Sequence, residues 1–248
     1  MIKIEDVGKV YDGKEVLKHI HLNIEDGETL AIIGGSGSGK STLLRLLIGL
    51  IRPSYGKIWV NDEEITHLDE HELDRVRLRM GMVFQYSALF DSMTVGDNVA
   101  FGLREHTKKS EEEIRAIVKE KLHIVGLDGV ENRMPPELSG GMQKRVSLAR
   151  AIAIEPEIIL YDEPSSGLDP IMSEKLDQLT IHTQRELHVT SIVVTHDMAS
   201  ACRIADRIAM IYEGELIAVA PVEEFKKLKD KRVQAFFHTL RTVKEDEA

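Results

Sequence analysis

The stretch "TLAIIGGSGSGKSTLLRLLIGL", Thr29–Leu50, decides the fold. In it a short apolar run is followed by a glycine-rich loop and then by an apolar helical pattern. Glycines permit a tight turn whose successive N–H groups form an anion-binding concavity, and a helix N-terminus adds positive potential. Gly34, Gly39, Lys40 and Ser41 occupy the fixed positions of the pattern G-x-x-x-x-G-K-[ST]. The stretch therefore predicts a strand, a phosphate-binding loop and a helix.

Within this loop we expect Lys40 to bridge the β- and γ-phosphates of a nucleotide and the Ser41 hydroxyl to bind Mg²⁺. A flexible Gly/Ser linker is the alternative interpretation, and the strand before the loop and the helix after it argue against a linker. The predicted nucleotide-binding residues of the loop are Gly34, Gly35, Ser36, Gly37, Ser38, Gly39, Lys40, Ser41 and Thr42.

Composition limits the function classes. The chain has 248 residues, of which 42% are hydrophobic, enough for a substantial core. Its 42 acidic and 32 basic residues give a net charge of −10, so we do not expect nucleic acid as a partner. Cys202 is the single cysteine, which excludes an internal disulfide and suits a reducing cytoplasm. We also expect no signal peptide and no transmembrane segment.

Short apolar runs alternate with helical patterns along the chain. Continuous runs rich in β-branched residues are typical of strands buried on both faces, as in a parallel sheet with crossover helices. The runs are Thr29–Gly34, Lys57–Asn61, Gly81–Gln85, Glu157–Glu163 and Thr190–Asp197. A hairpin pattern at Ile211–Val219 follows them. We therefore predict an α/β fold.

The pattern between Gln85 and Glu157 differs from the rest, because it is mainly helical. Ser110 and Glu113 form a capping box, and a helical apolar stripe follows it. The stripe consists of Ile114, Val118, Leu122 and Val125, and Gly126 ends it. We predict a helical subdomain over 86–155, inserted into a core formed by 1–85 and 156–220, with a C-terminal helical tail over 221–248.

Two carboxylates end the buried run "IILYDE", Ile158–Glu163. Because side chains alternate along a strand, the two carboxylates can have different roles. We expect Asp162 to contact Mg²⁺ and Glu163 to activate a water in line with the γ-phosphate. His196 ends another apolar strand and can sense the γ-phosphate. Each residue alone would more often be structural, and their order after a phosphate loop favours catalysis.

Two further residues are candidates by position. Gln85 is the last residue before the helical insertion, where it can contact Mg²⁺ or the water and report the nucleotide state to the insertion. Tyr11 precedes the phosphate loop, and its ring can stack on adenine. A core tyrosine is the alternative interpretation for Tyr11.

These motifs, with "LSGGM" at Leu138–Met142 and "SGLD" at Ser166–Asp169, resemble the ATP-binding subunit of ABC transporters over about residues 2–238. The resemblance implies a RecA-like P-loop NTPase core with N-terminal antiparallel β elements and an inserted α-helical subdomain. It also implies a head-to-tail dimer of two copies with two ATP molecules between them. Ser139, Gly140 and Gly141 would grip the γ-phosphate held by the partner, and Asp169 would lie at the dimer seam. Met142 departs from the usual "LSGGQ", yet the phosphate-binding groups of the motif are intact.

Two stretches, Phe84–Thr107 and Met134–Arg145, resemble more narrowly the ATPases of Mla/MCE-type phospholipid transporters. This resemblance implies a place on the cytoplasmic face of the inner membrane. The implied partners are a second copy, an integral membrane permease, an MCE-domain lipid-binding protein reached through the permease and, as an optional component, a STAS-domain protein. The apolar residues that would receive the coupling helix of the permease, or else form local core, are Leu89, Phe90, Met93 and Val95.

The tail carries an apolar stripe at helical spacing, formed by Val233, Phe236, Phe237 and Leu240. The stripe packs either on its own core or, as the resemblance implies, toward the partner ATPase.

Three other functions remain as alternatives. The first is the ATPase of another importer or exporter, for example one for amino acids. The second, a soluble ABC ATPase of DNA repair or translation, would require a coiled coil or two ATP domains, and a basic surface. The third, a regulator without turnover, would lack Glu163 or His196, and both are present.

Overall fold

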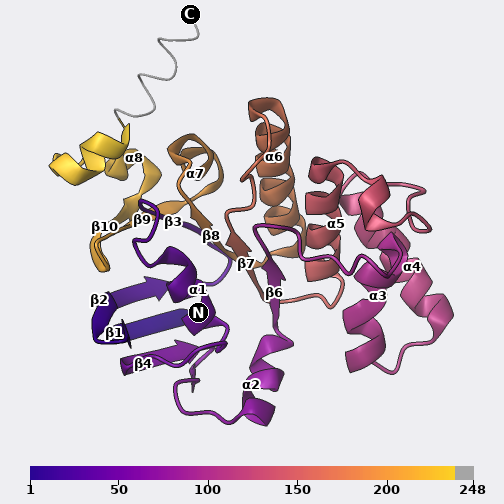
Figure 1. Ribbon diagram of the computed structural model, residues 1–248, viewed down its shortest axis with the longest axis horizontal. Helices are drawn as coiled ribbons and strands as arrows, with labels where there is room; N and C mark the ends of the chain where they lie inside the picture. Colours follow the sequence, from indigo (N-terminus) through magenta and orange to yellow (C-terminus); the bar gives the residue numbers. More distant parts are fainter. Residues whose placement is uncertain (238–248) are drawn as a thin grey trace, which may run out of the picture. The chain divides into compact units, whose positions relative to one another are not determined.

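The computed structural model describes residues 1–237 (Figure 1). The chain forms two compact units, one built from Met1–Val76 and the chain from Ser191 onward, the other from Arg77–Thr190. Over the described residues, no helix combines the length and the apolar character that crossing a membrane requires. The division into core, helical subdomain and tail, which we predicted from the change in sequence pattern, stays a prediction.

The first unit contains an antiparallel sheet in the order β2-β1-β4-β5. Its strands are β1 (Ile2–Tyr11), β2 (Lys14–Ile24), β4 (Tyr55–Val60) and β5 (Glu63–Glu64). Our placement of Lys57–Asn61 in the parallel sheet was wrong, because β4 pairs antiparallel with β1. Ile58 and Val60 are buried while Lys57 is exposed, which is the alternation of a strand covered on one face.

The same unit contains a parallel arrangement centred on β3 (Thr29–Ile33), all of whose residues are buried. Strand β3 pairs in parallel with β8 (Thr190–Thr195) and β9 (Arg207–Tyr212). The predicted hairpin is confirmed, since β10 (Glu215–Pro221) pairs antiparallel with β9. The helices of this unit include α1 (Lys40–Leu47), α2 (Glu70–Arg77, whose last residue belongs to the second unit), α7 (Met198–Ile204) and α8 (Val222–Phe225).

The described part of the tail packs on the first unit. Residues 231–237 are helical, and Val233 is fully buried in a cluster with Phe225. Phe236 and Phe237 pack against that cluster, with the ring centroids of Phe225 and Phe237 6.3 Å apart. For Val233, Phe236 and Phe237, these contacts favour the first of the two predicted arrangements, in which the tail packs on the core of the same chain. Leu240 lies outside the described residues.

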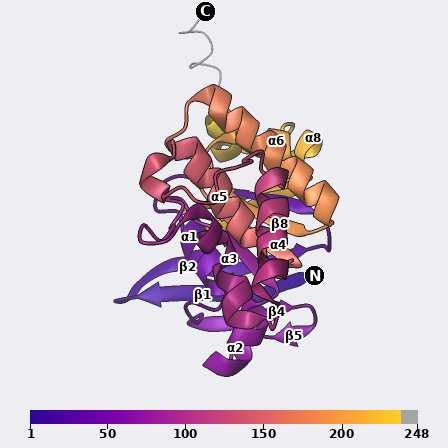
Figure 2. The same cartoon turned by 90° about the vertical axis from the view of Figure 1, so that its right-hand side faces the viewer.

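The second unit combines a parallel strand pair with helices (Figures 1 and 2). Strand β6 (Met80–Val83) pairs with β7 (Ile158–Asp162). The helices are α3 (Val95–His106), α4 (Glu111–Ile124), the short 3₁₀ helix Pro135–Glu137, α5 (Gly140–Ile152) and α6 (Pro170–Leu187). Helices α3, α4 and α5 contact one another.

The start of α4 confirms the predicted capping box. The Ser110 hydroxyl accepts a hydrogen bond from the N–H of Glu113, and the N–H of Ser110 donates to the Glu113 carboxylate. Ile114, Val118 and Leu122 then face the core. The amphipathic pattern in the sequence therefore identified both the beginning of this helix and its buried face.

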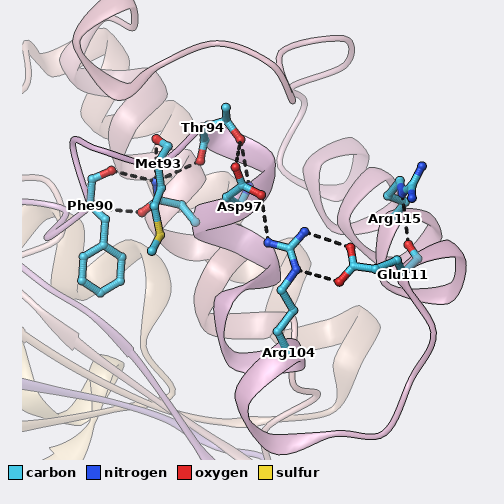
Figure 3. A network of polar contacts seen from close by, with 8 residues as sticks. Phe90, Met93, Thr94, Asp97, Arg104, Glu111 and Arg115 are labelled. Atoms are coloured by element: carbon cyan, nitrogen blue, oxygen red, sulfur yellow. Dashed lines mark hydrogen bonds and ion pairs between the residues drawn. The ribbon is translucent and has the colours of Figure 1, made fainter.

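An ion-pair network ties α4 to α3 (Figure 3). The Arg104 guanidinium donates two hydrogen bonds to the Glu111 carboxylate, at 2.9 and 3.0 Å, and one to Asp97 at 2.8 Å. The hydrogen bonds from Arg104 lower the pKa values of both carboxyl groups, and for Asp97 the Thr94 hydroxyl adds to this effect. Arg104 thus fixes two helices of the second unit to each other.

Candidate functional site

The phosphate loop lies between β3 and α1, in the predicted order. Helix α1 begins at Lys40 directly after Gly39, whose φ of 108° favours glycine. The Lys40 ammonium is buried at 7% exposure and donates hydrogen bonds to the carbonyls of Gly34 at 2.8 Å and Gly35 at 3.0 Å. The positive charge of Lys40 is therefore held against the backbone carbonyls of the loop.

The Ser38 hydroxyl in this loop is buried and has no hydrogen-bond partner among the described residues. A buried hydroxyl without a partner is costly, and an oxygen-rich ligand such as a phosphate would supply one. A Cβ at Gly34 would come within 2.6 Å of this hydroxyl and 2.3 Å of the Ile211 carbonyl oxygen, so glycine is required there. These features fit a phosphate ligand.

Tyr11, the last residue of β1, has an exposed fraction of 41%. The ammonium of Lys9 lies 5.0 Å from the centroid of its ring. The side chain is therefore not part of the core, which removes the alternative interpretation of a core tyrosine. The role of Tyr11 as a platform for adenine stays a prediction.

His196 is exposed and follows β8 directly. The next residue, Asp197, is the N-cap of α7, and its carboxylate accepts hydrogen bonds from the N–H groups of Ala199 and Ser200. His196 thus lies at a fixed strand-to-helix junction. It belongs to the same unit as the phosphate loop.

The acidic pair lies in the second unit, at the end of β7. Asp162 is the last residue of the strand, and Glu163 follows it with a φ of 47°, in the left-handed region. A side chain in that region costs on the order of 1–2 kcal/mol, and such strain is concentrated at functional sites. Both carboxylates are partly buried. The left-handed turn redirects the chain immediately after the strand.

Gln85 is bonded to two segments of the same unit. Its side-chain amide donates to the Ser166 hydroxyl at 3.3 Å, and its carbonyl accepts a hydrogen bond from the Lys144 ammonium at 2.5 Å. Burial lowers the pKa of Lys144, and the negative charge of Glu163 partly opposes that effect. Gln85, Lys144 and Glu163 therefore belong to one electrostatic neighbourhood.

Ser139 is the N-cap of α5, as a helix start at the "LSGG" motif requires. Its hydroxyl accepts a hydrogen bond from the N–H of Met142 at 3.3 Å. Ser139 and Gly140 are exposed. A Cβ at Gly141 would meet the mobile methyl end of the Met172 side chain at 2.8 Å. Met142 contributes its main chain to this turn.

Asp169 has the same local role at the start of α6. Its carboxylate accepts a hydrogen bond from the N–H of Met172 at 3.0 Å, and the residue is exposed. Both Ser139 and Asp169 therefore present a capped helix N-terminus to solvent within this single chain. Their predicted roles across a dimer seam stay predictions.

The residues predicted to hold Mg²⁺ offer suitable donor atoms. Ser41 belongs to the first unit, Gln85 and Asp162 to the second. Hydroxyl, amide and carboxylate oxygens are the hard ligands that Mg²⁺ prefers. Over residues 1–237 no group of three or more His, Cys, Asp and Glu side chains forms a metal site.

Lys144, whose ammonium donates a hydrogen bond to the Gln85 carbonyl, escaped our sequence analysis. Lys144 is a charged residue on a buried position of α5, three residues before the buried Ser147. A cation on the apolar face of a helix must have a partner, and this was the signal that could have identified it.

The family model described as "ABC transporter" matches residues 17–166. The probable ribonucleotide transport ATP-binding protein mkl of Mycobacterium leprae is 41% identical over 240 residues, which cover 97% of this chain and 69% of that protein. The intermembrane phospholipid transport system ATP-binding protein MlaF of Haemophilus influenzae is 41% identical over 236 residues, covering 95% and 89%.

A solved structure is also similar. It is a dimeric post-hydrolysis state of an ATP-binding cassette bound to ADP and phosphate, with a TM-score of 0.83 and 36% identity, covering 90% of this chain and 99% of that chain. These findings confirm the predicted fold class, a RecA-like P-loop NTPase core with an inserted helical subdomain, and the predicted ATPase. With its nucleotide motifs in family order and a family model matching residues 17–166, the chain belongs to the ABC transporter family.

Proposed function

We propose that this chain is the ATP-hydrolysing cytoplasmic subunit of an ABC transporter that moves phospholipids between the inner membrane and an MCE-type lipid-carrying system. The observation that carries the proposal is the 41% identity to the phospholipid transport protein of Haemophilus influenzae, over 89% of that protein. The geometry of the phosphate loop supports the ATPase part independently, because Lys40 and the unpartnered Ser38 hydroxyl are placed for phosphate.

In this proposal the phosphate loop, Gly34–Thr42, binds the phosphates of ATP through its N–H groups. Lys40 exchanges its hydrogen bonds with the Gly34 and Gly35 carbonyls for contacts with the β- and γ-phosphates. Tyr11 stacks on adenine, for which its exposed ring is suited. The loop thus supplies affinity for phosphate, and Tyr11 adds affinity for the base.

For hydrolysis, Glu163 orients a water toward the γ-phosphate and accepts its proton. His196 hydrogen-bonds the γ-phosphate, and Gln85 reports its presence. Ser41, Gln85 and Asp162 would hold Mg²⁺, which when bound neutralises charge on the β- and γ-phosphates. The left-handed backbone at Glu163 supports its role, because strain is retained where geometry matters.

The proposed active assembly contains a second copy of this chain. Ser139, Gly140 and Gly141 of one copy bind the γ-phosphate held by the other, with Asp169 at the seam. The exposure of Ser139, Gly140 and Asp169 supports this role, since a surface that joins two copies must be accessible in one. The similar solved cassette is described as a dimer.

A permease is the proposed membrane partner, and a groove of about 330 Å³ in the second unit is the proposed docking site for its coupling helix. Phe84, Phe90, Phe101 and Arg150 line this groove. Phe90 and Phe101 pack with ring centroids 4.9 Å apart and remain partly exposed. Of the apolar set predicted for docking, Val95 is fully buried and belongs to local core.

We propose that this chain reaches an MCE-domain protein through the permease and lies on the cytoplasmic face of the inner membrane. A STAS-domain protein that binds this chain is an optional component of the proposal. The test is to purify the chain from detergent-solubilised membranes and identify bound proteins and lipids by mass spectrometry. An MCE-domain protein with phospholipid supports the proposal. Recovery of an amino-acid permease without an MCE-domain protein would contradict phospholipid as the cargo.

Two substitutions test the chemistry. Glu163→Gln should retain ATP binding, abolish turnover and trap a closed dimer on size-exclusion chromatography. Lys40→Ala should weaken nucleotide binding itself, measured by a fluorescent ATP analogue. Full turnover by Glu163→Gln would exclude Glu163 as the base.

Ribonucleotides are the second candidate cargo, because the similar protein of Mycobacterium leprae is described as a ribonucleotide transport protein and is equally identical, at 41%. ATPase stimulation separates the two candidates. With the purified transporter, phospholipid vesicles should raise the ATPase rate, whereas a ribonucleotide other than ATP should leave it unchanged.

A further inference from the structure

The segment that follows β6, residues 85–94, is held in place mainly by its main chain. Ser87 and Ala88 have φ values of 61° and 48°, so two consecutive residues other than glycine adopt the left-handed conformation. Such a backbone is costly and persists only where surrounding structure holds it. Side chains from two neighbouring helices, α5 and α3, hold this segment.

Helix α5 supplies the first set of contacts. Lys144 donates to the carbonyl of Gln85 at 2.5 Å, and Arg150 donates to the carbonyls of Ala88 at 2.7 Å and Ser87 at 3.1 Å. Lys144 is 6% exposed, and burial lowers the pKa values of both cations. Hydrogen bonds from charged donors are roughly twice as strong as those between neutral groups.

Helix α3 supplies the second set through Asn98, which is fully buried. Its amide oxygen accepts from the N–H of Phe90 at 2.8 Å. Its NH₂ group lies within hydrogen-bond distance of the carbonyls of Phe90, Met93 and Thr94, at 3.0 to 3.2 Å. The two halves of the segment therefore have different anchors: α5 holds residues 85–88, and α3 holds residues 90–94.

Two aromatic side chains of the segment are exposed to solvent. Tyr86 is 86% exposed, and Phe90 is 42% exposed and lines the groove together with Ala88 and Arg150. Arg150 thus contacts the groove and holds the segment at once. Because α5 begins at the Ser139 cap, one continuous helix carries Ser139 at one end and both cations along its length.

We propose that Lys144 and Arg150 form a clamp that transmits movement of the Ser139 end of α5 to the Gln85–Ala88 segment and so to the groove. A helix moves as a rigid rod, so a displacement at its N-terminus reaches any backbone bonded to it. Lys144 and Arg150 are positioning residues in this scheme. The inference rests on the proposed docking of a permease to this groove.

The test follows the exposed Tyr86 position with an environment-sensitive fluorophore. The labelled chain carries Tyr86→Cys and Cys202→Ala, since Cys202 is the only other thiol. Adding Mg²⁺ and a non-hydrolysable ATP analogue should change the emission. In Lys144→Met and in Arg150→Met the change should shrink roughly fivefold or more, while analogue affinity changes less than about twofold.

Conservative variants at the same two positions separate a loss of coupling from a general loss of folding. Lys144→Arg retains a donor for the Gln85 carbonyl and should restore the response. Arg150→Lys retains one of two hydrogen bonds and should give an intermediate response, which serves as the test if the methionine variants do not fold. Asn98→Ala is the matched control, because it loosens residues 90–94 and should leave the response at position 86 intact.

An unchanged response in both methionine variants would overturn the clamp, as would a wild-type chain that binds the analogue without any response. Because no lipid is present, the outcome is independent of cargo. A transporter for another cargo can retain the clamp, and a phospholipid transporter can lack it.

Discussion

The hydroxyl of Ser139 accepts a hydrogen bond from the main-chain N–H of Met142, 3.3 Å away. The residue that departs from the usual "LSGGQ" thus completes the cap of α5 with an atom that every residue except proline possesses. We therefore expect Met142→Gln to change the steady-state ATPase rate by less than about twofold, as for a surface substitution. A change of about tenfold or more would show that the methionine side chain tunes closure of the dimer.

Ser139→Ala should do two things. Loss of the cap should lower the free energy of unfolding by about 1 kcal/mol. Loss of the hydroxyl should also lower the ATPase rate by about tenfold or more, because one transition-state hydrogen bond is removed. Chemical denaturation and a phosphate-release assay measure the two effects.

Ser110→Ala is the matched control, because Ser110 caps α4 in the same manner. It should cost a similar free energy of unfolding and leave the ATPase rate unchanged. Equal losses of rate in the two variants would mean that Ser139 acts only through helix stability.

Arg104→Gln should lower stability in a pH-dependent way. Arg104 holds the pKa values of Asp97 and Glu111 below their ordinary values of 3.8 and 4.5. For depressed carboxyl pKa values, the stabilisation is fully present above the unfolded-state values and is lost as the pH falls through the folded-state values. The wild type should therefore be more stable than the variant at pH 7, and urea denaturation at decreasing pH should show the difference vanish. A difference that grows toward acid would contradict the network.

Val233→Ala should lower the free energy of unfolding by about 2 kcal/mol, because it opens a cavity in a cluster where Val233 is fully buried. Denaturant unfolding measures the loss. The exposed neighbour Arg232 provides the control, and Arg232→Ala should cost much less. A Val233→Ala variant as stable as the wild type would mean that the tail does not pack on its own unit.

The sequence predicted much of this fold because its strongest patterns are local. The phosphate loop, the Ser110 capping box and the hairpin after β9 depend on glycines, caps and turns within a few residues. Strand β4 was placed in the wrong sheet because a five-residue run does not reveal its partner. The alternation of exposed Lys57 with buried Ile58 was the signal of a strand covered on one face, as in an antiparallel sheet.

The candidate site was predicted less completely than the fold. Motif residues such as Lys40 and Glu163 have a fixed spacing and were recognisable. The contacts of Lys144 with Gln85 and of Arg150 with Ser87 join positions about sixty residues apart. No periodicity encodes such pairs, and only the folded second unit brings them together.

Reconstitution tests the central claim most directly. The transporter is purified by capture of this chain and placed in phospholipid vesicles. The assay measures ATP-dependent transfer of a fluorescent phospholipid to an acceptor protein, for the wild type and for Glu163→Gln. The account predicts transfer by the wild type and none above background by Glu163→Gln. ATP hydrolysis by the wild type without phospholipid transfer, accompanied by transport of a ribonucleotide, would contradict it.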